Sequence, residues 1–582
     1  MLRRILFVCL YSLMLPVLIQ AQQPQITRST SFDEPSDGAS RLLLMKNGNT
    51  MFLHFTRKSG IDVVVYDKNH HAGTLVNNHV NSWKQKQMVR ASLAGLFELN
   101  GQAVAFLVQY LHKKPCLYRF IFDGTTGKLV NEELVADLPR LGLAAGYSLV
   151  YGGVSMPDFF VRKDPESEYY AVAAFNSFAH DRNERIKVTH FGPDHKKINE
   201  AFYESPKGTY KYLEFMEMFV HRDEFVFVAS YGYNTRASGG KDSRVIISRL
   251  MKGTKQFEYN LLNYTDDYRE PDIAVKYNAS NKTLYMLAAV NAKSAGRPYT
   301  MYTSSENMVL QMNVINPNSL EVRKKYFIDH PELSDYAKNH LKYKKPYYGV
   351  IQDFRINTDS TITLMFEELN AQKDTRVTTN YNNIPGGTTS TRSSSTSTST
   401  SISTTLGDIG IVRINEEGQE IPGSYAIAKK QVTATWLNDL YIYRRPQTSW
   451  TFRRGILRSG NYNAGFFSYD YVFANNTGYT IFNESPDNTK EENENYRKKK
   501  GHLSVSIDNT ILAWYADNTV KKAYLFGEPK KKDESRFSVL EMNTHSEDGK
   551  SLATLMLERK GNDKKAYIVW VNFEENNGRV VE

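Results

Sequence analysis

The chain contains very little cysteine and only one long apolar run. It has 2 cysteines in 582 residues. Cys9 lies inside the apolar run near the N-terminus, which leaves Cys116 alone in the rest of the chain. An intramolecular disulfide is therefore excluded once that run is removed, and the fold must depend on a hydrophobic core, which a chain of this length can build. We expect Cys116 to be a small buried residue rather than a nucleophile.

The single apolar run covers residues 5–19 and follows Arg3 and Arg4. It is shorter than the about 18 apolar residues of a spanning helix, and Pro16 interrupts it. We therefore interpret residues 1–21 as a cleaved signal peptide, with an uncleaved membrane anchor as the alternative. No later stretch has the length and apolarity of a transmembrane segment. The sequence predicts an exported bacterial protein of the periplasm, the cell surface or the extracellular space.

The excess of positive over negative charge is also small. The formal net charge is +10, and the two arginines of residues 1–21 account for two of these charges, since that segment has no acidic residue. Spread over so large a surface and placed outside the cytosol, this excess favours polyanionic glycans over nucleic acid as partners. We expect no nucleic-acid partner, and the oligomeric state is left open.

Short apolar runs separated by tight turns make up most of the remaining chain. Residues 96–136 hold four such runs, with turns at Asn100-Gly101 and at 123–127. Asn-Gly and Asp-Gly pairs supply the positive φ angles that tight hairpin turns require. The 37 tyrosines and 30 phenylalanines are typical of half-buried strands. The stretch predicts a sheet of four antiparallel strands.

The same four-run unit recurs eight times, at intervals of about 55–75 residues, and resembles the β-propeller architecture. Separate sandwiches or one long sheet would lack the constant order of hairpin, link and hairpin. We predict an all-β fold, a propeller of eight blades with seven as the alternative, spanning residues 42–582. Within the N-terminal segment 22–41, the strand expected at 25–32 is a candidate to complete the last blade and close the ring. The predicted units are 42–76, 96–135, 159–198, 216–262, 272–328, 348–428, 469–526 and 537–581.

Motifs with a defined chemistry are missing from this pattern. The chain has no glycine-rich phosphate loop, no G-x-S-x-G turn and no zinc-ligand spacing of histidine and cysteine. Residues 546–549 resemble the Asp box of sialidase-like propellers, but the following glycine and aromatic residue are absent and the motif occurs once. No specific family is identified from the sequence, and the chain is expected to lack a cofactor.

Loop length distinguishes the two faces of the predicted ring. The first-to-second and third-to-fourth turns of each unit are mostly short, whereas the second-to-third links and the connections between units are long. In a four-stranded meander these two classes of long loop emerge on the same side, the long-loop face. Insertions confined to one face of a repeat protein commonly mark its binding face.

Two insertions on this face have unusual compositions. Residues 388–405 are almost entirely serine and threonine, so we expect a disordered loop. It is either an insertion that the fold tolerates or, as the alternative, a segment whose hydroxyl groups are glycosylated. The insertion 429–467 gathers aromatic and arginine side chains suited to stacking on sugar rings or binding carboxylated polymers. The alternative is that these aromatic residues pack the insertion onto neighbouring blades. Its candidate binding residues are Trp436, Tyr441, Tyr443, Arg444, Arg445, Trp450 and Arg453.

Acidic residues near the predicted propeller mouth offer a second hypothesis. Asp266 and Asp267 precede a probable inner strand, and Glu367 precedes the serine-rich insertion. Paired carboxylates could act as general acid and base on a glycan, and the two aspartates could instead hold a calcium ion. The leading hypothesis remains a non-catalytic module that binds a protein or glycan partner in the cell envelope through the long-loop face. A glycan-active propeller enzyme is the alternative.

Overall fold

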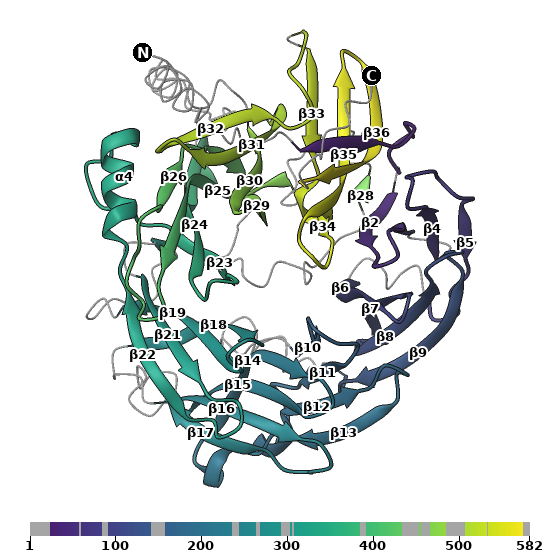
Figure 1. Cartoon of the computed structure of the whole chain (residues 1–582), viewed down its shortest axis with the longest axis vertical. Helices are drawn as coiled ribbons and strands as arrows, with labels where there is room; N and C mark the ends of the chain where they lie inside the picture. Colours follow the sequence, from purple (N-terminus) through teal and green to yellow (C-terminus); the bar gives the residue numbers. More distant parts are fainter. Residues whose placement is uncertain are drawn as a thin grey trace, which may run out of the picture.

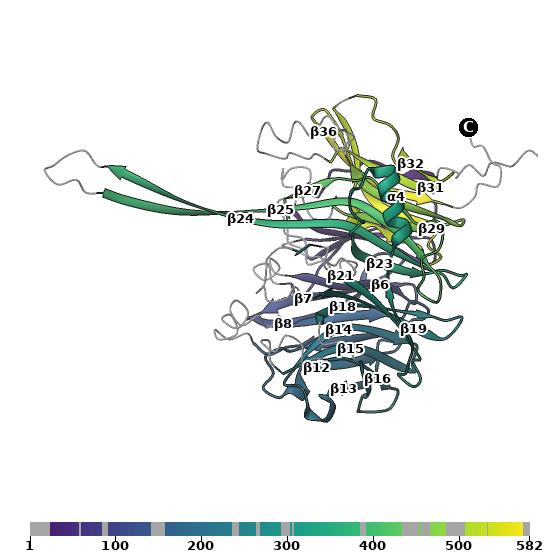
Figure 2. The same cartoon turned by 90° about the vertical axis from the view of Figure 1, so that its left-hand side faces the viewer.

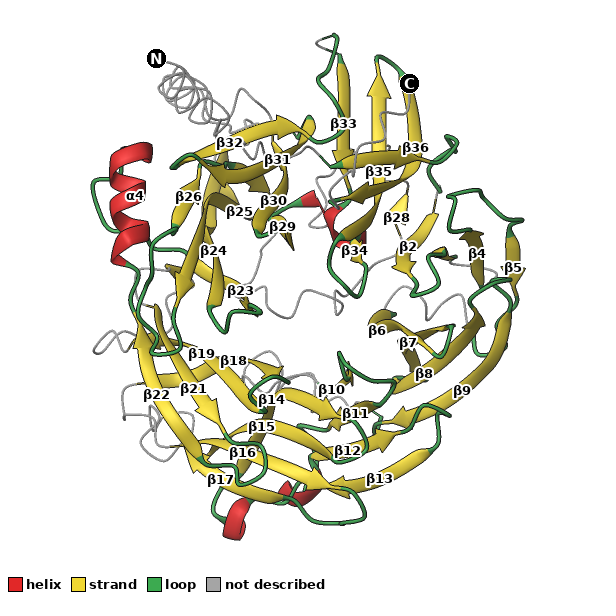
Figure 3. Ribbon diagram, in the orientation of Figure 1, coloured by secondary structure: helices red, strands yellow, loops and turns green. Residues whose placement is uncertain are grey.

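The structure is a computed structural model in which β-strands form a ring around a central axis (Figures 1 and 3). It describes residues 24–35, 37–56, 60–83, 91–140, 157–234, 244–262, 268–292, 303–304, 308–383, 392–433, 453–454, 466–484, 507–531 and 533–573.

Four antiparallel strands form each blade, beginning with an inner strand at the axis and ending with an outer strand at the rim. Blades 1 to 4 consist of β2 (Asp37–Leu44), β3 (Thr50–Phe55), β4 (Ile61–Tyr66) and β5 (Val76–Asn78); β6 (Ser92–Leu99), β7 (Gln102–Leu111), β8 (Lys114–Asp123) and β9 (Leu129–Asp137); β10 (Asp158–Lys163), β11 (Tyr170–Phe175), β12 (Ile186–Phe191) and β13 (Lys197–Phe202); and β14 (Tyr212–His221), β15 (Phe225–Tyr233), β16 (Arg244–Met251) and β17 (Glu258–Leu262).

The second half of the ring follows the same plan, with additional short elements. Blade 8 has its inner strand split in two by a short 3-10 helix, and a single parallel bridge from Asn509 to Arg536 joins it to blade 7. Blades 5 to 8 consist of β18 (Tyr268–Asn278), β19 (Thr283–Ala292), β21 (Met308–Ile315) and β22 (Val322–Ile328); β23 (Val350–Ile356), β24 (Ile362–Asn383), β25 (Arg392–Ile414) and β26 (Tyr425–Ile427); β29 (Tyr469–Ala474), β30 (Thr477–Glu484), β31 (Asn509–Ala516) and β32 (Thr519–Tyr524); and β33 (Glu534–Ser538), η6 (Leu540–Met542), β34 (Thr544–His545), β35 (Ser551–Lys560) and β36 (Asp563–Asn572).

Burial falls from the middle to the rim in most blades, although the outer strand β26 of blade 6 is buried. All nine residues of β15 are buried, because strands lie on both sides of it and neighbouring blades cover both faces. The outer strand β9 is exposed along most of its length. Hairpin turns follow the residue types that the sequence indicated: Asn100 and Gly101 have φ angles of 50° and 74°, and Asn475 and Asn476 have 50° and 59°. These positive angles match the twist of the flanking strands.

Eight clusters of buried hydrophobic residues lie among the described parts of the chain, one between each pair of neighbouring blades. The cluster between blades 1 and 2, for example, joins Met51 and Val63 to Leu93 and Phe120. The cluster between blades 8 and 1 closes the ring by joining Trp570 to Phe52. The predicted β-propeller is thus confirmed, and the described strands divide into eight blades, with blades 7 and 8 joined in one nine-stranded sheet.

The N-terminal strand β1 (Gln25–Arg28) lies beside the last strand of the chain. It pairs antiparallel with β36 from Gln25–Asn572 to Arg28–Val569, and the purple strand among the yellow ones in Figure 1 marks this place. The backbone pairing continues to Phe32, whose N–H donates to the carbonyl of Ala566 at 3.0 Å. Blade 8 therefore takes its outer strand from the opposite end of the chain. This strand covers the outer edge of β36 from Val569 to Asn572.

The serine-rich segment differs from the expected disorder where the structure describes it. Residues 392–405 belong to β25 and pair residue by residue with β24, up to Asn383–Arg392. The two strands run well beyond the ring as a two-stranded ribbon on the long-loop side (Figure 2). Composition alone did not predict this, because the ribbon satisfies its backbone by extending an existing hairpin rather than by burying apolar area. We call residues 372–383 and 392–403 the arm.

Several short elements flank the blades. The helix α4 (Pro331–Leu341) was expected only as a connection; it lies at the outer rim, with Leu333 and Ala337 in the core between blades 5 and 6. The carboxylate of Glu420 accepts the N–H groups of Glu332 and Leu333 at its first turn. The remaining elements are β20 (Thr303–Ser304), β27 (Gln431–Thr433), β28 (Arg453–Arg454), η1 (Arg182–Glu184) and η2 (Pro206–Gly208). Among the described helices, none has the length and apolarity needed to cross a membrane.

Candidate functional site

A buried ion pair lies where the arm leaves blade 6. The carboxylate of Glu367 on β24 and the ammonium group of Lys429, just after β26, are in direct contact, and both side chains are fully buried. Burying two charges is costly unless each is paired and hydrogen-bonded. Ser468 Oγ donates to the second oxygen of Glu367 at 2.6 Å, and Lys429 Nζ donates to Gln431 Oε1 at 3.0 Å. The pair is therefore compensated on both sides.

The hydrogen bonds of this pair continue into blade 7. Gln431 Nε2 donates to the carbonyl of Asn483 at 2.6 Å, and Gln431 Oε1 accepts the N–H of Ser468 at 3.0 Å. Asn483 Nδ2 in turn donates to the carbonyl of Ser538 in blade 8 at 2.8 Å. This network connects three blades at the foot of the arm. The polar side chains can be buried there because they are hydrogen-bonded to one another.

The next residue, Glu368, lies in an irregular part of the hairpin. Pairing shifts from Glu367–Ile409 to Leu369–Leu406, so that Glu368 faces two residues, Gly407 and Asp408. Such a β-bulge redirects a side chain out of the regular ladder. A Cβ atom on Gly407 would lie 2.5 Å from the Glu368 carboxyl group, so only glycine fits at this position. The bulge thus brings the carboxyl groups of Glu368 and Asp408 into one half-buried site.

Tyr343, from the link between α4 and β23, completes this site. Its hydroxyl group donates to Asp408 Oδ2 at 2.8 Å and also interacts with Glu368. The backbone N–H of Lys429 donates to Asp408 Oδ1 at 2.9 Å, and the N–H of Asp408 donates to Glu368 at 3.3 Å. We call Tyr343, Glu368 and Asp408 the acid–tyrosine site. It lies directly beside the buried ion pair, at the foot of the arm on the long-loop side.

Burial changes the acidity of this site. Burial, and after it the neighbouring charge of Asp408, raise the pKa of Glu368 to about 7 against the opposing effect of the hydrogen bond from Tyr343. Burial also raises the pKa of Asp408. The pKa of the Tyr343 hydroxyl group is raised by burial and, in addition, by the negative charges of Asp408 and Glu368. A carboxyl group that titrates near neutral pH can hold or accept a proton under physiological conditions. The site can therefore act as a donor or as an acceptor of hydrogen bonds.

The raised pKa of Glu368 predicts a measurable pH dependence. Because the folded protein holds this proton more tightly than the unfolded chain, the contribution of Glu368 to stability is fully present below about pH 4.5 and is lost as the pH rises through about 7. We expect Glu368→Gln to raise the free energy of unfolding by about 2 kcal/mol at pH 8 and to leave it nearly unchanged at pH 5. Urea unfolding at both pH values measures this.

A matched control separates this effect from general charge removal. Glu416 is exposed on the same blade, in the turn between β25 and β26, so Glu416→Gln removes one acid without altering a buried site. Its unfolding curves should follow those of the wild type at both pH values. An equal stabilisation by Glu368→Gln at pH 5 and pH 8 would contradict a neutral-range titration of Glu368.

The structure places only some of the residues that the sequence singled out. Glu367 is described and is fully buried in the ion pair, so a ligand at the surface does not contact it. Arg453 is described as part of β28, whose backbone pairs with Gly38 of the inner strand of blade 1. The other candidates lie outside the described residues: Asp266, Asp267, Trp436, Tyr441, Tyr443, Arg444, Arg445 and Trp450.

Sequence reasoning missed most of the acid–tyrosine site. The sequence singled out Glu367, but consecutive residues of a strand point to opposite sides, and the sequence does not show whether Glu367 or the next residue, Glu368, is accessible. Asp408 and Tyr343 are 40 and 25 residues from Glu368 along the chain, so no local spacing joins them. The one available signal was Gly407-Asp408, a glycine and an acid at the end of the serine-rich run.

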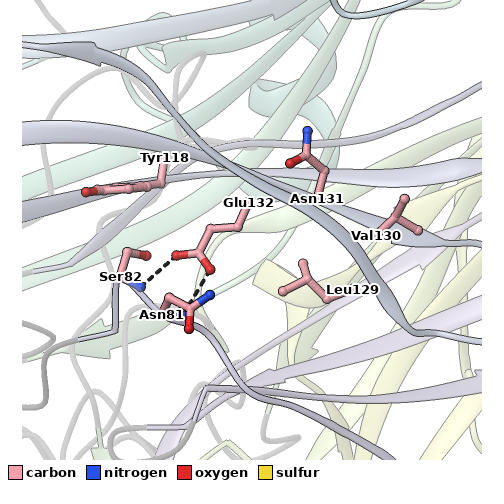
Figure 4. Close-up of a pocket in the computed structure, with 7 residues that line it drawn as sticks. All are labelled: Asn81, Ser82, Tyr118, Leu129, Val130, Asn131 and Glu132. Carbon is pink, nitrogen blue, oxygen red and sulfur yellow. Dashed lines mark hydrogen bonds between the residues drawn. The ribbon is translucent and has the colours of Figure 1, made fainter.

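A separate pocket of about 570 Å³ opens at the rim between blades 1 and 2 (Figure 4). Its walls include Tyr118 and the exposed Val130. The acid in this pocket, Glu132, accepts the backbone N–H groups of Asn81 at 3.0 Å and Ser82 at 2.6 Å. Both carboxylate oxygens thus fix a loop of blade 1 to β9, and we assign this pocket a structural role.

Metal binding finds no support in the described part of the chain. Among those residues, no three histidine, cysteine, aspartate or glutamate side chains are grouped closely enough to hold a metal ion. The calcium hypothesis concerned Asp266 and Asp267, which lie outside these residues, and it remains a prediction from the sequence.

Comparison with known proteins identifies no family for this chain. No protein-family model matches this chain, and no curated protein matches it in sequence. Among solved structures, it is similar to the polysaccharide lyase Uly1, with 8% identity and a TM-score of 0.36 over 83% of this chain and 90% of the lyase. It is also similar to an α-L-arabinanase of Penicillium chrysogenum, with 11% identity and a TM-score of 0.30 over 58% of this chain and 81% of that one. A GH43 endo-arabinanase of Bacillus licheniformis has 12% identity and a TM-score of 0.24 over 49% and 96%. Similarity at this level identifies neither a family nor an activity.

Proposed function

We propose that this protein is an exported, non-catalytic binding module that engages a protein or glycan partner through its long-loop face. The observation that carries the proposal is the acid–tyrosine site, a partly accessible group of hydrogen-bonding side chains at the foot of the arm. Glu368 and Asp408 offer carboxyl oxygens, and Tyr343 offers an aromatic ring with a polar tip. Such groups suit the hydroxyl groups of sugars and the polar side chains of proteins.

The geometry favours binding over two-acid catalysis. Glycoside hydrolysis needs two carboxyl groups on either side of the scissile bond, about 5–10 Å apart, with the sugar between them. Here the Tyr343 hydroxyl group interacts with both Asp408 and Glu368, so the two carboxyl groups already share a hydrogen-bonding partner. Glu367, the described catalytic candidate of the sequence, is fully buried and neutralised by Lys429. Binding needs no such separation.

A glycan-active enzyme remains the second candidate because of one observation, the pKa of Glu368 near 7. A general acid must be protonated at the working pH, and this value allows it. The two functions differ in what Glu368→Gln does. In an enzyme this variant loses turnover and keeps ligand affinity, whereas in a binding module there is no turnover to lose.

The decisive experiment compares partner capture by residues 22–582 and by two variants of the long-loop face. One variant carries Trp436→Ala, Arg444→Ala, Arg445→Ala and Trp450→Ala; the other carries Tyr343→Phe and Glu368→Gln. Native envelope extract and a glycan array are the two sources of partner. We expect the wild type to bind a partner and at least one variant to bind it about tenfold or more weakly, without a loss of thermal stability.

The opposite face provides the control. Lys68, Lys128 and Lys255 are exposed in short turns of blades 1, 2 and 4, so their replacement by alanine changes surface charge away from the long-loop face. This triple variant should capture the partner as the wild type does. Loss of capture by the control alone would move the binding surface to the short-turn face. Release of sugar products from the array by the wild type would establish the enzyme instead.

A further inference from the structure

Along most of the arm, neither outer backbone edge is paired with another described strand. Short strands flank its base: β20 pairs with β24 as far as Ala371, and β27 pairs with β25 as far as Thr404. Beyond these points the two strands of the arm pair with each other, from Gln372–Ser403 to Asn383–Arg392. Among the described residues no further strand pairs with either outer edge. Figure 2 shows the arm extending away from the ring on its own.

A ribbon of this kind is incomplete by the usual standard for sheets. Two strands alone are marginally stable in water, and three or more are needed for independent stability. The twelve residues of each arm strand span about 40 Å, a long row of N–H and C=O groups that no other described strand pairs. The arm therefore has the form of a sheet that lacks its neighbours.

The two edges differ in how they are protected. Natural proteins guard open edges with charges, proline or bulges. The β24 half of the arm contains Lys373, Asp374 and Arg376. In contrast, residues 393–403 of β25 contain no charged residue, no proline and no glycine. The edge of β25 is thus the one that nothing guards against another strand.

The sequence of this edge matches itself. Residues 395–401 alternate serine and threonine without interruption. When a two-fold axis perpendicular to the sheet relates two antiparallel strands, each odd-numbered residue lies opposite an odd-numbered residue of the other copy. Each even-numbered residue likewise lies opposite an even-numbered one. Two copies of this run therefore place threonine opposite threonine and serine opposite serine, around an axis near Thr398. Such pairs are favourable in antiparallel sheets, and no like charges oppose each other.

We propose that two copies of the protein associate through this edge, with β25 of one chain antiparallel to β25 of the other. The two arms then form one four-stranded sheet in the order β24, β25, β25 of the second copy and β24 of the second copy. The contact is narrower than a standard protein interface, so the association depends on protein concentration. The inference is independent of the partner proposed above, because it concerns the arm and not the acid–tyrosine site.

Sedimentation velocity of residues 22–582 at about 1–100 µM tests the pairing. We expect a dimer that dissociates on dilution. Thr398→Lys places two like charges opposite each other near the axis and should weaken the dimer about tenfold or more. The matched control is Val377→Lys, because Val377 is the partner of Thr398 on the other strand of the same arm and should tolerate the charge. A monomer throughout, or equal dissociation by both variants, would overturn the proposal.

Cysteine scanning gives a second readout that does not depend on a destabilising change. Cys116 is the one other cysteine in residues 22–582, and it is buried. Single substitutions to cysteine at 396, 397, 398, 399 and 400 should give a covalent dimer on mild oxidation, with the yield highest at one position and falling on both sides. The same yield at every position, or no covalent dimer, would exclude a fixed antiparallel register.

Discussion

Replacing Lys429 with alanine is expected to lower the free energy of unfolding by about 3–5 kcal/mol. The cause is the carboxylate of Glu367, which is fully buried and would lose the cation that neutralises it. Ser468 would still donate to Glu367, but one neutral hydroxyl does not replace a charge at this depth. Gln431 Oε1 would also lose one of its two donors, the Lys429 ammonium group at 3.0 Å, and keep the N–H of Ser468. Urea unfolding followed by tryptophan fluorescence measures the loss.

Removing both charges together should cost less than removing one. In the double variant Glu367→Gln and Lys429→Met, no charge is left buried without a partner, so we expect it to recover about 2 kcal/mol relative to Lys429→Ala. Lys521→Ala, which changes an exposed lysine on β32, serves as control and should stay within about 0.5 kcal/mol of the wild type. A loss below about 1 kcal/mol for Lys429→Ala would show that the Glu367 carboxylate is not held in a desolvated pair.

Deleting residues 22–33 is expected to lower the free energy of unfolding by about 4–6 kcal/mol. The deletion removes the whole of β1 and its ladder on β36. It also removes Ser29, whose N–H donates to the carbonyl of Ile568 at 2.9 Å and whose hydroxyl accepts the N–H of the same residue at 3.0 Å. Phe32, which packs on Phe52 of blade 1 with ring centroids 5.7 Å apart, would be lost as well.

Addition of the missing strand from outside provides the control for this deletion. A synthetic peptide of residues 22–33 should bind the shortened protein at the free edge of β36 and restore part of the lost stability, whereas a peptide of scrambled sequence should not. The shortened protein alone should also associate more readily, because β36 would present an open edge. Unchanged unfolding of the shortened protein would mean that the hydrophobic cluster that joins Trp570 of blade 8 to Phe52 of blade 1 suffices to hold the ring closed.

Most of the fold could be predicted because its signals are local. Alternating apolar residues gave the strands, and pairs such as Asn100-Gly101 and Asn475-Asn476 gave hairpin turns with the positive φ angles that the structure contains. Repetition of the unit then indicated a propeller, since a single four-stranded sheet cannot bury both of its faces. The eight hydrophobic clusters between blades follow from this requirement.

The candidate site could not be predicted in the same way, because its parts come from distant segments. Lys429 follows Glu367 by 62 residues and pairs with it only after the arm and β26 have folded between them. Which of Glu367 and Glu368 is accessible depends on the bulge at Gly407, a feature of the pairing register rather than of composition. The serine-rich run was misjudged for a related reason. Its low apolar content was evident, but the strand that it continues was not.

The pairing of β1 with β36 has a consequence for the order of biogenesis. The first strand of the ring leaves the ribosome before any blade exists, and its partner leaves last, with Asn572 following Gln25 by 547 residues. Blades 2 to 7 can each form from contiguous sequence while the chain is still being made. The ring as a whole cannot, so its completion coincides with the release of the C-terminal blade. A chain that ends before β36 leaves β1 without its partner strand and the ring open. In this architecture an incomplete chain therefore exposes strand edges that the complete protein pairs.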